Sequence, residues 1–175
     1  LDIDNNTILF VNGILDQRTL KNFKYNEKLK VVDLGILKEK STLKISENFI
    51  KDSVFNLGVM DFKEGFYFEF DKNLVLDKPI KLVNYYNANK DFSRITSFNI
   101  FHVQSGSEIS FIENDINDGE SSFNLKLNKF ICEKNSVLKF GKFYQGKGDN
   151  HLLSYNYFTL KKHSVLKIDA LNKES

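Results

Sequence analysis

A short phrase of alternating apolar residues recurs along this sequence and limits the folds that the chain can adopt. FICEKNSVLKF, at 130–140, returns as FTLKKHSVLKI at 158–168 and, more loosely, as FHVQSGSEISF at 101–111. The segment FEFDKNLVL, at 68–76, reads as a degenerate earlier copy. A unit that repeats at a spacing of about 28 residues is typical of a solenoid, in which each coil packs on the next.

Each copy consists of two alternating runs that flank residues of turn character, at 104–106, 133–135 and 161–163. Because successive side chains of a strand point to opposite faces, every second residue of a run is expected to face the interior. The predicted inward positions are Phe101, Val103, Ser107, Ile109 and Phe111 in the first copy, Phe130, Cys132, Ser136, Leu138 and Phe140 in the second, and Phe158, Leu160, Ser164, Leu166 and Ile168 in the third. Each copy therefore predicts a strand, a sharp corner and a second strand.

A further short alternating run precedes each copy. The apolar members of these runs are Phe98 and Ile100, then Phe123, Leu125 and Leu127, then Leu153, Tyr155 and Tyr157. One repeat is thus predicted to hold about three strands and a loop. A helical repeat would need apolar residues at i, i+3, i+4 and i+7, and these windows alternate at period two instead. We predict an all-β fold, a right-handed parallel β-helix in which equivalent residues of successive coils stack roughly 4.8 Å apart.

The N-terminal part is predicted to form a lead-in of strands and a helix. The segment at 7–13 reads as a strand ending in a hairpin signal, Asn12-Gly13, and 28–35 reads as the next strand. Residues 46–60 have a helical apolar pattern, with Ser46 as the N-cap. Pro79 is expected to mark a corner or an edge. We therefore divide the chain into a lead-in, 1–60, and a β-helix core, 61–175.

The composition limits the classes of partner. The formal net charge of +2 argues against binding to nucleic acid or a membrane surface by electrostatic attraction. The single cysteine excludes an intramolecular disulfide framework and suits a reducing compartment. No stretch has the roughly 20 apolar residues that span a bilayer, and the N-terminus lacks a secretion signal. Because the chain starts at Leu1 and stops directly after a repeat, we expect it to be part of a longer protein.

Several phrases resemble the SufD family. In the segment 54–84 an Asn-containing helical stretch, a Glu-Gly turn, an alternating strand and a Lys-Asn corner precede a phrase of the form V-x-x-x-P-I-x-L. The residues of these features are Asn56, Glu64-Gly65, Phe66 to Phe70, Lys72-Asn73, and Val75, Pro79, Ile80 and Leu82. ILFVNGIL, at 8–15, and SGSEISFIE, at 105–113, resemble further turns and strands of that family. The related SufB proteins share the fold, but the phrase around Pro79 is more similar to SufD.

The resemblance implies a non-catalytic scaffold subunit that pairs with SufB and the ATPase SufC to assemble iron–sulfur clusters, in the cytoplasm or a plastid. It covers the lead-in and the first part of the β-helix, so the ATPase-docking region and the suspected cluster residues of the family would lie beyond Ser175. We therefore expect no enzymatic activity, no cofactor and no metal site in this part, and possible self-association through its exposed last coil. The alternative is a polysaccharide-acting β-helix enzyme or an adhesin.

Four residues are the obvious candidates for metal or redox chemistry. Cys132 aligns with Val103 and Leu160, two inward apolar positions, so we interpret it as a buried structural thiol. His102 is expected on the outward side of its strand, and His163 falls in a corner. Neither these nor His151 has a partner at the spacing of a metal site. We therefore assign no metal, cofactor or catalytic residue.

Two segments resemble binding loops without matching them. Residues 113–120 place Glu113, Asp115 and Asn117 like the early ligands of a calcium loop, but Asp118 stands at the glycine position and Asn124 at that of the bidentate Glu. Residues 141–150 combine Gly, Lys and aromatics, but they lack the spacing of a phosphate-binding loop. We predict a flexible loop between coils there. The carboxylates are scattered, so no glycosidase pair can be nominated.

Overall fold

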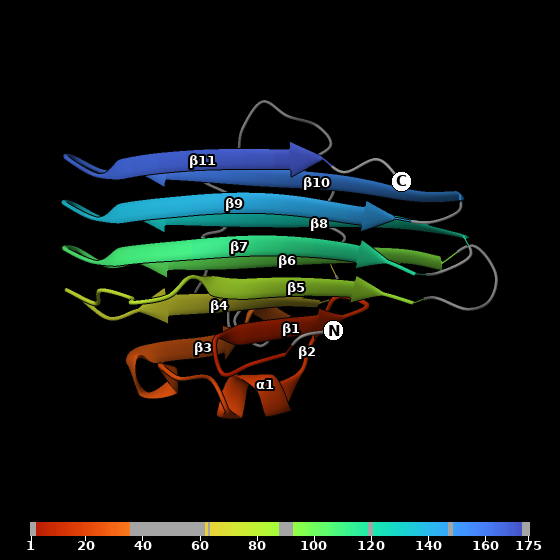
Figure 1. The fold of residues 1–175 in the computed structure, drawn as a ribbon, viewed down its shortest axis with the longest axis horizontal. Coiled ribbons are helices and arrows are strands. Elements are labelled where there is room, and N and C mark those ends of the chain that lie inside the picture. Colours follow the sequence, from red (N-terminus) through yellow and green to blue (C-terminus); the bar gives the residue numbers. More distant parts are fainter. Residues whose placement is uncertain are drawn as a thin grey trace.

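The computed structural model describes residues 3–35, 62, 64–87, 93–118, 121–146 and 149–172. Two sheets form a parallel β-solenoid of about three turns (Figure 1). Sheet A, in spatial order, contains β11 (Val165–Asn172), β9 (Val137–Gly146), β7 (Glu108–Asn117), β5 (Ile80–Tyr86), β1 (Thr7–Val11) and β2 (Ile14–Leu15). Sheet B contains β10 (Asp149–Leu160), β8 (Ser121–Cys132), β6 (Ser93–Val103), β4 (Glu64–Phe70) and β3 (Leu29–Asp33). The all-β solenoid prediction is confirmed.

The strands of each sheet pair in the register that the repeat alignment predicts. Phe101 pairs with Phe130, and Phe130 with Phe158, so equivalent residues of successive coils are stacked. On sheet A, Ile109, Leu138 and Leu166 form the matching row. The alignment holds because the period of two leaves one register that buries the apolar face, and a shift by one residue would expose it.

Aromatic rings fill the interior next to the corners. The rings of Phe68, Phe101, Phe130 and Phe158 form a ladder with 5.0 Å between successive ring centroids, nearly parallel at each step. Phe111 and Phe140 of sheet A meet this ladder edge to face. The participation of Phe68 confirms that 68–76 belongs to the repeat. Offset-stacked and edge-to-face rings attract each other beyond the burial of their area, so this ladder reinforces the strand spacing that the backbone hydrogen bonds set.

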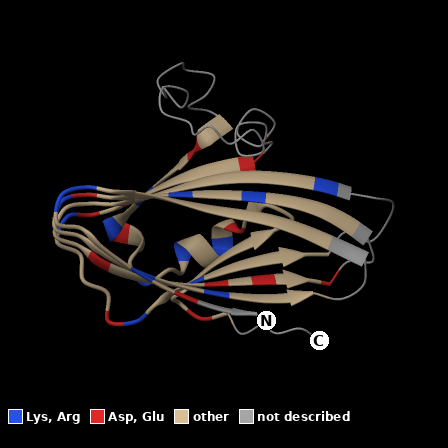
Figure 2. Cartoon of the chain, turned by 90° about the horizontal axis from the view of Figure 1, so that it is seen from above, with Lys and Arg blue, Asp and Glu red and all other residues tan. Residues whose placement is uncertain are grey.

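The corners share one backbone conformation. Asn73, Asn135 and His163 have positive φ angles of 56°, 60° and 61°, and Gly106 occupies the equivalent position with φ 75°. Gly and Asn tolerate this left-handed conformation better than other residues. Ser136 and Ser164 then close their corners, since each hydroxyl donates a hydrogen bond of 2.7 Å to the carbonyl three residues earlier. In Figure 2, charged residues of both signs mark the chain along these corners, where the two sheets meet.

Each coil holds two long strands, so the prediction of about three was wrong. The apolar run before each copy belongs to the same strand as the copy, as in β6, β8 and β10. Phe98, Leu127 and Tyr155 lie in one row and face outward, whereas Phe101 and its equivalents face inward. Leu34 and Phe62 cover part of this outer face of sheet B. A strand that is apolar on both faces near its middle reads as two short runs, which explains the error.

The lead-in strands are built into the same two sheets. β1 pairs parallel to β5, and Asn12-Gly13 turns the chain into β2 as predicted. β3 lies within the predicted 28–35 strand and pairs antiparallel to β4. Between β2 and β3 lie helix α1 (Gln17–Lys21), capped by Asp16, and the 3-10 helix η1 (Asn26–Lys28), which were not predicted. Pro79 directly precedes β5. The helix predicted at 46–60 lies outside the described residues.

Candidate functional site

The interior changes from apolar to polar with distance from the corners. On β7 the inward row continues from Phe111 to Glu113, Asp115 and Asn117, and on β8 it runs back from Phe130 to Asn128 and Lys126. All of these side chains are buried. Buried ionic groups are stable only when they are paired and hydrogen-bonded. The cluster of Glu113, Asp115, Lys126 and Lys142, together with the amides around it, is therefore the candidate site, and we call it the interior charge cluster.

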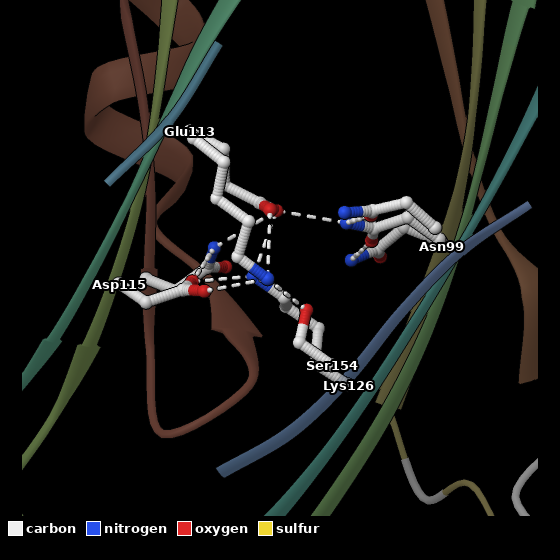
Figure 3. Close-up of polar contacts among 9 residues, drawn as sticks. Asn99, Glu113, Asp115, Lys126 and Ser154 are labelled. Atoms are coloured by element: carbon white, nitrogen blue, oxygen red, sulfur yellow. Dashed lines mark hydrogen bonds and ion pairs between the residues drawn. The ribbon is translucent and has the colours of Figure 1, made fainter. Parts of the chain in front are cut away.

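Lys126 is the centre of this cluster. Its Nζ lies 2.8 Å from Oε1 of Glu113 and contacts Oδ1 of Asp115. The lysine comes from sheet B and both carboxylates from sheet A, so the ion pairs cross the interior (Figure 3). The side chains of all three are at most 1% exposed. One ammonium group thus holds the two carboxylates in place.

Asparagines support the carboxylates from both sheets. Asn128 donates to Oε1 of Glu113 at 2.8 Å and to Oδ1 of its stacked equivalent Asn156 at 3.0 Å. On sheet A, Asn84 donates to Oδ1 of Asp115 at 2.8 Å. The amide donors supply hydrogen bonds that the carboxylates lose on leaving water, which reduces the desolvation penalty of the buried charges.

Lys142 is the second cation, and its contacts differ from those of Lys126. Its Nζ donates to the Ser154 hydroxyl at 2.6 Å, and it lies 3.8 Å from Oε2 of Glu113 and 3.5 Å from Oδ2 of Asp115. These two oxygens are buried and accept no hydrogen bond within the described residues. Lys142 therefore balances the second negative charge through space, while its hydrogen bond goes to a neutral hydroxyl.

The two lysines have opposite pKa shifts. Burial by itself would lower the pKa of Lys126, but the adjacent Asp115 and Glu113 outweigh it and raise that pKa above the ordinary lysine value. Burial lowers the pKa of Lys142, and repulsion from Lys126 adds to this, while the more distant carboxylates only partly oppose it. Lys126 is thus a permanent structural cation, whereas Lys142 is the more easily neutralised amine.

The Nζ atom of Lys126 contacts the carboxylates of both Glu113 and Asp115. Within the part of the chain that the structure describes, no group of three or more His, Cys, Asp or Glu side chains is arranged to hold a metal ion. The carboxylates and amides could otherwise suit a hard cation. The cluster carries its own ammonium counter-ion instead, so its first role is electrostatic and structural.

The structure places Cys132 as the sequence predicts. Its side chain is fully buried in the row of Val103, and burial raises the pKa of the thiol to about 11. His163 lies in a corner and His151 is exposed on β10. Neither of these two forms part of the interior charge cluster.

His102 lies on the outward side of sheet B, as predicted, but it has partners from neighbouring strands. Its Nδ1 is 2.6 Å from the Tyr67 hydroxyl and its Nε2 is 3.1 Å from Oε1 of Glu133. The Tyr67 hydroxyl in turn donates to Glu69 at 2.9 Å. This chain of contacts joins three coils of sheet B and stabilises its outer face.

Two local interpretations need correction or refinement. Glu113, Asp115 and Asn117 do share one face, but they lie on the strand β7, so 113–117 has no calcium-loop geometry. The flexible loop predicted at 141–150 is wrong for most of its length, since 141–146 completes β9 and Asp149 begins β10. This correction turns Lys142 from a loop residue into an inward residue of a strand.

The interior charge cluster was not predicted, although a signal for it exists. Glu113 and Asp115 continue the inward phase of Ile109 and Phe111, and Lys126 stands four residues before Phe130. Following the alternation past the apolar residues would have placed these charges inside. Sequence analysis normally places charged residues on the surface, because buried charges are rare unless they are paired. It therefore misses a buried cluster of this kind.

The sequence matches no model of a known protein family, and no curated protein is significantly similar to it. Among the described residues, no helix has the length and apolar character needed to cross a membrane.

Proposed function

We propose that this chain is the β-helix part of a non-catalytic scaffold subunit of an iron–sulfur cluster assembly complex, as in SufD proteins. In this proposal the full-length protein pairs with a SufB-like subunit and with the ATPase SufC. The observation that carries the proposal is the conformation of 64–84, within the segment that resembles SufD. It folds as β4, a corner at Lys72-Asn73 and β5, which together make the first complete coil.

A scaffold must hold its partner surfaces in fixed relative positions, and two features of the interior supply that rigidity. The phenylalanine ladder packs successive coils together next to the corners. Farther along the strands, Lys126 joins sheet B to both carboxylates of sheet A. Ionic and aromatic contacts of this kind define a single arrangement of the two sheets more sharply than a uniform apolar core does.

The polysaccharide-acting alternative receives less support. A hydrolase of that class needs two carboxyl groups that face a substrate from the surface. The closely spaced acids Glu113 and Asp115 face the interior and are bound to Lys126. We therefore keep the scaffold as the function that the residues favour.

Co-purification tests the proposal most directly. The full-length protein, co-expressed with the SufB-like subunit and the ATPase, is expected to form a stable complex, and Cys132→Val in the full-length protein is expected to bind equally well. Residues 1–175 alone are expected to leave the ATPase unbound and to stay colourless after anaerobic incubation with iron and sulfide. Stoichiometric ATPase binding by this part, or an iron–sulfur absorption band that disappears in Cys132→Ser, would contradict the proposal.

A further inference from the structure

The amine of Lys142 combines two properties that the other buried lysine lacks. Its side chain is 23% exposed, whereas that of Lys126 is 1% exposed. Its hydrogen bond goes to the neutral hydroxyl of Ser154, whereas Lys126 is bound directly to two carboxylates. Part of the Lys142 side chain is therefore open to solvent, and its ion pairs with Glu113 and Asp115, at 3.8 and 3.5 Å, are longer than the 2.8 Å pair of Lys126 with Glu113.

The surroundings of Lys142 also favour its neutral form. Burial lowers the pKa of this amine, and the neighbouring ammonium of Lys126 lowers it further. Only a neutral amine has the lone pair that attacks a carbonyl carbon, and lysines that act as nucleophiles are activated by burial and by an adjacent cation. At neutral pH a larger fraction of Lys142 is therefore reactive than of a lysine at an exposed corner.

The two carboxylate oxygens nearest to Lys142 complete the site. Oε2 of Glu113 and Oδ2 of Asp115 are buried, accept no hydrogen bond within the described residues, and lie 3.8 and 3.5 Å from Nζ. A positive charge kept on this nitrogen would be stabilised by both oxygens at low local dielectric. Ser154, at 2.6 Å, is placed to exchange a proton with the same nitrogen.

We propose that Lys142 is a covalent attachment site for small aldehydes, which it binds as a protonated imine. The neutral Nζ attacks the carbonyl carbon and forms a C–N bond, and the proton that the nitrogen loses goes to the carbonyl oxygen to give a carbinolamine. A second proton, taken up from solvent, protonates the carbinolamine hydroxyl. The C–O bond then breaks, water leaves with its electron pair, and the nitrogen keeps its remaining proton as an iminium ion. No electrons are transferred, so the step needs no oxidant or reductant.

The same geometry predicts selectivity for carbonyl compounds over acyl donors. An iminium ion keeps the positive charge on Nζ, so Glu113 and Asp115 continue to face two cations. An amide formed by acylation is neutral, and it would leave two buried carboxylates with Lys126 alone. The acylated form therefore loses the attraction of these two carboxylates for Nζ, which the iminium ion keeps. The inference does not depend on the scaffold proposal, because it concerns only the interior of the solenoid.

Reductive alkylation tests this site. The folded protein is treated briefly with acetaldehyde and cyanoborohydride at pH 7, and the modified lysines are quantified by peptide mass spectrometry. Cyanoborohydride reduces the iminium ion, so the rate at each lysine reports how much iminium forms. Lys142 is expected to react several-fold faster than the exposed corner residue Lys162, because burial and the neighbouring ammonium of Lys126 lower the pKa of Lys142. The difference is expected to vanish in urea.

Variants separate the contributions of the neighbours. Lys142→Arg keeps the charge and the fold, checked by thermal unfolding, and is expected to remove the fast-reacting peptide. For each protein, the rate of Lys142 modification by acetaldehyde is divided by its rate of acetylation by an acetyl ester, which reports only the nucleophilicity of the amine. In Glu113→Gln this ratio is expected to fall, because the iminium ion loses one of its two carboxylate partners. The proposal is overturned if Lys142 reacts no faster than Lys162 in the folded protein, or if Glu113→Gln leaves that ratio unchanged.

Discussion

The Nζ atom of Lys126, on β8, lies 2.8 Å from Oε1 of Glu113, on β7 of the opposite sheet. This ion pair connects the two sheets at a point where the aromatic ladder no longer fills the space between them. The same ammonium group also contacts Asp115, so Lys126 makes the closest ion pairs of both acidic side chains, and Lys142 lies farther from them. The stability of the polar half of the interior is therefore expected to depend more on Lys126 than on Lys142.

Replacement of Lys126 by Met should lower the free energy of unfolding by about 3–5 kcal/mol, because it leaves two buried carboxylates facing Lys142 alone. Urea unfolding at pH 7 measures the loss. The control is Lys139→Met, which removes a surface ion pair with Glu108 at 2.6 Å and should change the stability by about 1 kcal/mol or less. The triple variant with Glu113→Gln and Asp115→Asn should recover part of the loss. Equal effects of Lys126→Met and Lys139→Met would show that the cluster is solvated.

Replacement of Leu138 by Ala should cost about 2–5 kcal/mol, since it opens a cavity in the apolar row shared with Ile109 and Leu166. Chemical unfolding compares this variant with Leu153→Ala, whose parent side chain is 41% exposed on the outer face of sheet B. The control should unfold within about 0.5 kcal/mol of the unchanged protein. A small effect at Leu138 would mean that this row does not face the core.

The thiol of Cys132 should be alkylated slowly in the folded state and quickly after unfolding. Burial raises its pKa from 9.0 to about 11, so the reactive thiolate is scarce at pH 8. The raised pKa also makes the free energy of unfolding fall between pH 9 and 11, because the unfolded chain loses its thiol proton first. Over that interval the loss attributable to Cys132 should approach about 2–3 kcal/mol.

The variant Cys132→Val isolates this thiol. It should be well tolerated at pH 7 and should show a smaller loss of stability between pH 9 and 11 than the unchanged protein, as measured by urea unfolding at each pH. Rapid labelling of the thiol under native conditions would show that the residue faces outward, against the register of β8.

Replacement of His163 by Gly should stabilise the protein by up to about 1 kcal/mol, because His163 holds a φ of 61° that Gly adopts without strain. The β-branched His163→Ile should be destabilising by about 1–2 kcal/mol. Melting temperatures report both changes. As a matched position, Asn135 has φ 60°, and Asn135→Gly should be closer to neutral, since Asn already tolerates this conformation. The prediction requires that stability decrease in the order His163→Gly, unchanged protein, His163→Ile, and any other order contradicts it.

The sequence by itself determined the repeat, the inward phase and the corners. Phe101, Phe130 and Phe158 could be aligned without coordinates, because a strand alternates at period two and a solenoid stacks equivalent residues. The inward Cys132 followed from the same alignment. Even the degenerate copy at Phe68 could be placed, since the row needs only one large apolar residue in each coil.

Only the tertiary structure decided which residues meet across the two sheets. Glu113 and Lys126 are 13 positions apart on strands of different sheets, and no linear pattern specifies a contact across the interior. The structure also shows that each pair of short runs is one long strand, and that Lys142 lies in β9 and not in the predicted loop. The physical reason is that alternation fixes the face on which a side chain lies, while the pairing of charges depends on the spacing of the two sheets and on burial, which arise only when the coils stack.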